Sequence, residues 1–173
     1  MENGESKFKE NNRIIREETK KTILISFAMV ISVVIYALIP ILLLKNSTVK
    51  LFGIKYATIT NIYNAFNILA IMIVISILTV RKTIYYSPKF VKDSMSLKDI
   101  LKTWKKLDII LLGLGESVSI LGIIISFMGV PFNRTFHFFV TSVLIILIVM
   151  PVNWKVRDKL KILEKQRDLY FDF

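Results

Sequence analysis

The sequence contains no cysteine, and this absence excludes disulfides, thiolate catalysis and cysteine metal sites. It contains one histidine, His137, and a lone histidine cannot form a multi-histidine metal site. Phosphate-binding and nucleophile motifs are also missing, and the acidic residues form no cluster at one predicted membrane depth. We therefore expect no catalytic residues, no bound metal, no cofactor and no enzymatic activity.

Long apolar runs are what the chain has in abundance. Of its 173 residues, 54% are hydrophobic, whereas soluble domains have roughly 45–50%. Each of four runs is close to the roughly 17–25 residues that an α-helix needs to cross a bilayer, where only hydrogen-bonded backbone is tolerated. The sequence thus predicts an all-α polytopic membrane protein, a bundle of four transmembrane helices at residues 22–44, 57–80, 107–129 and 136–152.

The runs divide the chain into a polar basic N-terminal segment, a transmembrane domain and a charged tail, at residues 1–21, 22–152 and 153–173. Of the 24 basic residues, 20 lie before the first run, between the second and third, or after the fourth. The other four are Lys45, Lys50, Lys55 and Arg134. Because excess Lys and Arg mark the cytoplasmic face, we expect both termini inside a plasma membrane.

The formal net charge of +11 bears on partners. The basic residues flank apolar runs, so we expect anionic lipid head groups on the cytoplasmic face as partners, and no nucleic acid. The abundance of Ile, Lys and Asn is typical of an AT-rich bacterial genome, which favours a bacterial inner or cell membrane.

The connection between the second and third runs has an amphipathic pattern. Apolar residues recur at three- and four-residue spacing, and Ser96 with Asp99 has the form of a helix N-terminal capping box. The pattern predicts a short amphipathic interfacial helix with Trp104 at headgroup depth. The alternative is a basic amphipathic entry to the third span. The apolar positions are Leu97, Ile100, Leu101, Trp104 and Leu107.

The third run carries small residues spaced four, three, four and three apart. Such a stripe lets a neighbouring helix approach closely, so it predicts helix packing. The stripe consists of Gly115, Ser119, Gly122, Ser126 and Gly129.

Glu116 lies near the middle of the third run, where a charged carboxylate costs roughly 2.5–3.5 kcal/mol and the neutral acid is therefore favoured. Asn61, Asn64 and Asn67 recur every three residues in the second run, and Asn67 falls near the same depth. These residues are the candidate ion, proton or interhelical polar site. Two interpretations stay open, an ion path and a structural hydrogen bond between helices.

From Glu116 onward, the twelve residues Glu-x-x-x-Ile-x-Gly-Ile-Ile-x-Ser-Phe resemble the carboxylate-bearing helix of rotary ATP synthase and ATPase proteolipid subunits. In that family the glutamate binds the transported proton or sodium ion. The resemblance implies that Glu116 carries an ion and that Gly122 is a close-packing position. As a whole, the chain also resembles small four-helix bacterial membrane proteins.

Three kinds of function are consistent with these features. The first is a membrane interaction or accessory protein that packs through the stripe, in a homo-oligomer or a larger membrane complex. The second is proton or cation translocation by Glu116, and the third is export of a small molecule.

Overall fold

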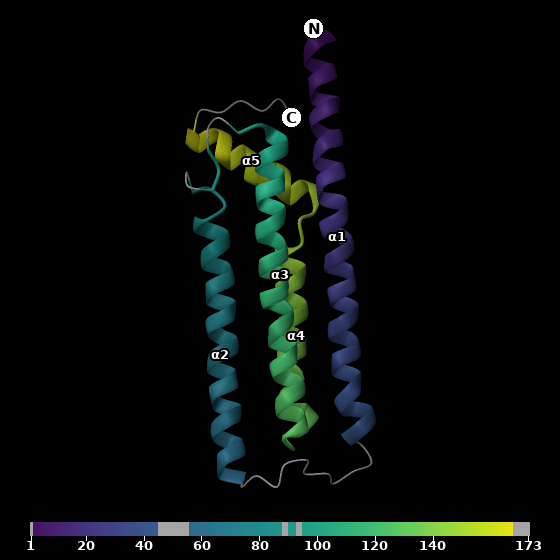
Figure 1. Ribbon diagram of the computed structural model, residues 1–173, viewed down its shortest axis with the longest axis vertical. Helices are drawn as coiled ribbons and strands as arrows, with labels where there is room; N and C mark the ends of the chain where they lie inside the picture. The colour runs from purple at the N-terminus through teal and green to yellow at the C-terminus, as the bar shows by residue number, and fades with distance from the viewer. Residues whose placement is uncertain (1, 45–55, 88–89, 93–94, 168–173) are drawn as a thin grey trace. The chain divides into compact units, whose positions relative to one another are not determined.

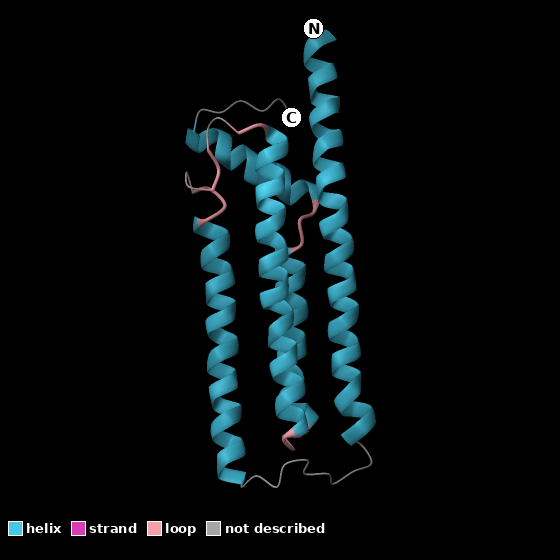
Figure 2. Cartoon of the chain, viewed as in Figure 1, coloured by secondary structure: helices cyan, strands magenta, loops and turns pink. Residues whose placement is uncertain are grey.

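In the part of the chain that its computed structural model describes, residues 2–44, 56–87, 90–92 and 95–167, the regular secondary structure is all α-helical, with turns and loops between helices (Figures 1 and 2). Four of the helices are long and apolar enough to cross a membrane, as the sequence predicts. Three lysines of the expected outer loop, Lys45, Lys50 and Lys55, lie outside the described residues. The helices are α1 (Glu2–Leu44), α2 (Tyr56–Thr83), α3 (Leu97–Phe127), α4 (Phe132–Val149) and α5 (Asn153–Arg167).

These helices form two compact units. Unit 1 comprises Met1–Ile25, Thr79–Ile110 and Met150–Phe173, and unit 2 comprises Ser26–Leu78 and Leu111–Val149. The N-terminal segment and the tail, which the sequence separates from the bundle, thus belong to one unit with the α2–α3 connection.

Unit 1 has its own hydrophobic core, which includes residues from both ends of the chain. The segment expected to lie at the membrane interface is continuous with α3, and its Ile100, Leu101 and Trp104 are buried in this core. The segment is therefore the amphipathic start of α3. The Ser96 cap is present, because the Asp99 amide donates to Ser96 Oγ and the Ser96 hydroxyl donates to the Asp99 carboxylate. Other core residues are Ile15, Tyr85, Val91, Val156, Leu160 and Leu163.

The C-terminal segment folds as a separate helix in unit 1. Helix α4 ends at Val149, and Pro151, which lacks an amide hydrogen to continue the helix, follows before α5 begins at Asn153. The buried residues of α5, Val156, Lys159, Leu160 and Leu163, recur at three- and four-residue spacing and so lie on one face. A lysine therefore occupies a core-facing position of this helix.

In unit 2, α3 packs against α4 through the predicted small residues (Figure 1). A Cβ atom at Gly122 would lie 2.9 Å from Phe138 Cβ, and one at Gly115 would lie 2.7 Å from Ile145 Cγ2. The Ser142 hydroxyl donates to the Gly115 carbonyl over 2.8 Å. Because Gly115 and Gly122 have no side chains, α4 can approach α3 closely at these two positions.

Gly129 has a different role from the predicted one. Helix α3 ends at Phe127, and Gly129 adopts a positive φ of 96°. The Gly129 amide donates to the Ser126 carbonyl, and the Val130 amide donates to the Ile125 carbonyl. These are the two bonds of a Schellman motif, which requires the left-handed conformation that glycine adopts without strain. Gly129 therefore ends α3, and a Cβ atom at this position would meet nothing within 4 Å.

The parts of α1 and α2 in unit 2 expose apolar faces. An apolar face is stable without a protein neighbour when lipid chains cover it, so these faces are compatible with membrane spans. The exposed side chains include Phe27, Ile31, Val34, Ile35 and Leu38 on α1, and Ile68, Ile71, Met72, Ile75 and Leu78 on α2.

Candidate functional site

The most unusual polar group in unit 1 is a buried carboxylate. Asp108, in the fourth turn of α3 beyond its cap, is 3% exposed, and Tyr85 of the α2–α3 connection is fully buried. The Tyr85 hydroxyl donates a hydrogen bond to Asp108 Oδ1. Burial and the charge of Asp108 both raise the pKa of Tyr85, so the phenol stays protonated and remains a donor.

Lys159 of α5 is the cationic partner of Asp108. Its Nζ atom lies 3.8 Å from Asp108 Oδ1 and 3.7 Å from the centroid of the Tyr85 ring. Lys159 is 8% exposed, and burial lowers its pKa to about 8, although the Asp108 charge acts in the opposite direction. The indole of Trp104 donates to the Tyr85 carbonyl over 3.0 Å and so fixes this connection against α3.

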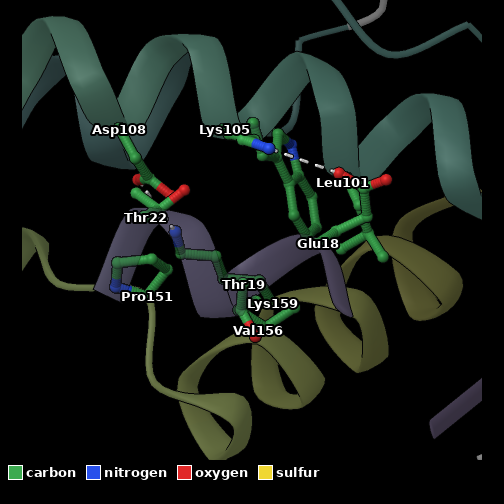
Figure 3. Close-up of a pocket in the computed structure, with 10 residues that line it drawn as sticks. Glu18, Thr19, Thr22, Leu101, Lys105, Asp108, Pro151, Val156 and Lys159 are labelled. Atoms are coloured by element: carbon green, nitrogen blue, oxygen red, sulfur yellow. Dashed lines mark ion pairs between the residues drawn. The ribbon is translucent and has the colours of Figure 1, made fainter. Parts of the chain in front are cut away.

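A small pocket opens beside this ion pair, among α1, α3 and α5 (Figure 3). Glu18 on α1 and Lys105 on α3 form an ion pair at 3.6 Å along it. Thr19 also lines the pocket, and its Oγ1 lies 2.8 Å from Asn153 Oδ1. Polar contacts thus connect distant segments of the chain, and Thr19 and Asn153 are 134 residues apart in the sequence. The complete lining is Glu18, Thr19, Thr22, Leu101, Trp104, Lys105, Asp108, Pro151, Val156 and Lys159.

The residues of the predicted intramembrane site lie in unit 2. Glu116 is half-buried, Asn67 is half-buried, and Asn61 and Asn64 are exposed. The Asn67 amide donates to the Tyr63 carbonyl over 2.9 Å, and its Oδ1 lies 2.7 Å from His137 Nε2. Asn67 therefore has His137 of α4 as its side-chain partner, and the described contacts do not join it to Glu116.

The serines of the α3 stripe are buried and hydrogen-bonded. The Ser119 hydroxyl donates to the Glu116 carbonyl, and Ser126 Oγ lies 2.8 Å from Thr135 Oγ1 of α4. Both serine side chains are fully buried.

Sequence reasoning missed the Tyr85, Asp108 and Lys159 cluster. A usable signal existed for Lys159, because it falls on the apolar face defined by Val156, Leu160 and Leu163. A lysine on such a face needs a buried partner of opposite charge. Asp108, an acidic residue at the start of the third apolar run, is a candidate for that partner.

Among the residues that the structure describes, no three His, Cys, Asp or Glu side chains are grouped so that they could hold a metal ion. Comparison of the chain with protein-family models, curated proteins and solved structures gave no match. The class of protein therefore rests on the fold and the site alone. It is an all-helical protein with four candidate membrane spans. One of its two compact units is formed by both ends of the chain and the α2–α3 connection.

Proposed function

We propose that the chain is a small integral membrane protein that acts as an interaction or accessory subunit, with unit 1 on the cytoplasmic face as its interaction module. The observation that carries the proposal is the location of charge. Of the 24 basic and 13 acidic residues, 20 and 12 fall within unit 1, which gives it a net charge of +8. A folded unit of this charge at a membrane surface attracts acidic partners and anionic lipid.

The packing of α3 favours the surface of unit 1, rather than the small-residue stripe of α3, as the interaction surface. The small residues Gly115 and Gly122 contact α4 of the same chain, so their packing is used within the protomer. The exposed surface of unit 1 is therefore the better candidate for contact with a partner. Its buried cluster of Tyr85, Asp108 and Lys159 serves this role by holding α5 to α3.

Co-purification in mild detergent tests the proposal. Lys102 and Lys106 of α3 and Lys161 of α5 are exposed in unit 1. We expect a partner that co-purifies with the wild type to be lost when all three are changed to Gln, because the acidic partner loses its attraction to unit 1. The matched control is Glu116→Gln, which leaves unit 1 unchanged and should retain the partner. Equal recovery with both variants would contradict the proposal.

Proton or cation translocation by Glu116 is the second candidate function. It is favoured by one observation: Glu116 is half-buried, and no described side chain forms a hydrogen bond or ion pair with its carboxyl group. A carboxyl group without such a partner is free to exchange a proton or cation. In liposomes, this function requires an ion flux that Glu116→Gln abolishes while the variant still folds. The accessory role requires the same background flux for wild type and variant.

A further inference from the structure

Helix α2 is the least covered of the four candidate spans in unit 2. In its most apolar window 11% of the residues are buried, against 44% in the corresponding window of α3. Six exposed positions follow one another along α2 at alternating intervals of three and four residues, and we call them the α2 seam. The α2 seam consists of Asn61, Asn64, Ile68, Ile71, Ile75 and Leu78.

The spacing of the α2 seam is that of a helix-pairing surface. Alternating intervals of three and four keep residues on one side of a helix, and this is the heptad pattern with which two helices pack along their length. Left-handed pairs of this kind are also the commonest arrangement of transmembrane helices. The side of α2 that contacts its own protomer is a different one, since Ala70 and Ile77 are buried and Asn67 contacts His137 of α4.

The two asparagines distinguish the α2 seam from a surface that lipid alone could cover. The candidate span Thr58–Thr83 has 26 residues, about six more than the roughly 20 that cross the hydrocarbon layer. When the layer is centred on this span, it begins near Asn61, and Asn64 lies inside it. Neither asparagine side chain forms a hydrogen bond with any residue that the structure describes. An amide without a partner is costly in hydrocarbon, so this face needs a polar neighbour.

Helix α1 provides the contrast. Between Ser26 and Leu42, every exposed residue of α1 is apolar, so lipid chains can cover this face without leaving a polar group unpaired. The exposed amides of α2 require a neighbour that offers both a donor and an acceptor at their depth, because an amide carries both.

A second copy of the chain meets this requirement without any other partner. Two copies that insert in the same orientation place the same residues at the same depth. Asn61 and Asn64 of one copy then face amides of the other, and the isoleucines below them face isoleucines. Such an interface is symmetric, because the same surface is used on both copies.

We propose that the α2 seam binds the α2 seam of a second copy of this chain, as a parallel helix pair in which the amides of Asn61 and Asn64 form hydrogen bonds across the interface. Asparagine in a seam of apolar residues fixes the register of paired helices, since only one alignment pairs the amides. The inference rests on the proposed membrane insertion. It goes beyond the accessory role by assigning a surface and a partner to self-association.

Cysteine cross-linking in liposomes tests the pairing. The chain has no cysteine, so Ile68→Cys places a single thiol in the α2 seam. After reconstitution at a low protein-to-lipid ratio and mild oxidation, this variant should form a disulfide-linked dimer, because residue 68 meets its counterpart in a parallel pair. The matched control is Ile31→Cys on the apolar face of α1, where the isoleucine is also 61% exposed, and it should stay monomeric. Equal dimer yields, or no dimer with either variant, would overturn the pairing.

The role of the amides is tested in the Ile68→Cys background. Changing Asn61 and Asn64 together to Leu should lower the dimer yield by about tenfold, because the hydrogen bonds between the helices are lost. Both positions are exposed, so the thermal midpoint of the protomer in detergent should not fall.

The control for this change is Asn133→Leu, at an exposed position near the start of α4, and it should leave the dimer yield unchanged. An unchanged yield with the double variant would overturn the role of the amides. The assay contains no other protein and does not depend on the charge of unit 1, so its failure is distinct from failure of the accessory role.

Discussion

Replacing Lys159 with Met is expected to lower the free energy of unfolding by about 3–5 kcal/mol, because it leaves the buried Asp108 carboxylate without its cation. Methionine fills a similar volume, so the loss comes from electrostatics more than from packing. Lys161→Met, at an exposed position of the same helix, should stay within about 0.5 kcal/mol of the wild type. Reversible denaturation in detergent would measure both.

A substitution at Asp108, combined with Lys159→Met, measures the interaction energy between the two residues. Asp108→Asn keeps an acceptor for the Tyr85 hydroxyl but removes the buried negative charge. The double variant with Lys159→Met should therefore lose less stability than the two single variants combined, with a coupling of about 1–3 kcal/mol. Strictly additive losses would show that Asp108 and Lys159 do not stabilise each other.

Gly122→Leu is expected to destabilise unit 2 by about 3 kcal/mol, at the upper end of typical overpacking costs. Even a Cβ atom at this position would lie 2.9 Å from Phe138 Cβ and 3.1 Å from Phe139 Cζ. The rest of a leucine side chain would force α4 away from α3. The thermal midpoint in detergent is the measurement.

Gly113→Leu is the matched control for this substitution. It introduces the same residue into the same helix, but a Cβ atom at Gly113 would meet nothing within 4 Å. Because leucine is a better helix former than glycine, this variant should be as stable as the wild type or more stable by about 0.5–1 kcal/mol. Equal destabilisation by the two substitutions would show that close α3–α4 packing at Gly122 does not stabilise the protein.

Much of unit 2 could be predicted from sequence because its signals are local. The positions of the candidate spans follow from apolar runs, although α1 and α3 begin well before them, at Glu2 and Leu97. The spacing of Gly115 and Gly122 identifies the face that packs. The end of α3 was harder to predict. Gly129 fits the small-residue spacing, but the spacing alone does not distinguish a packing glycine from one that ends a helix.

Unit 1 was less predictable because it depends on contacts between distant segments. The spacing of Ile100 and Trp104 is the same whether their face meets lipid or the core of a protein, and here it meets a core. From the sequence alone, Lys159 would be taken for a solvent-exposed lysine. Its role in an ion pair becomes visible only when α5 is placed against Asp108. Likewise, matching depth suggested Glu116 as the partner of Asn67, whereas His137 makes that contact.

The proposed function requires unit 1 to lie on the cytoplasmic side of the membrane. Because the chain has no cysteine, one introduced cysteine reports one position without background. Asn133 is exposed at the start of α4, and Lys161 is exposed in unit 1. Because of the charge asymmetry, we expect these two positions to lie on opposite faces of the membrane.

Labelling with a membrane-impermeant maleimide is the direct measurement. In intact cells, Asn133→Cys should react, whereas Lys161→Cys should react only after the membrane is permeabilised. Reaction of Lys161→Cys in intact cells, with Asn133→Cys protected, would place unit 1 outside and contradict the account.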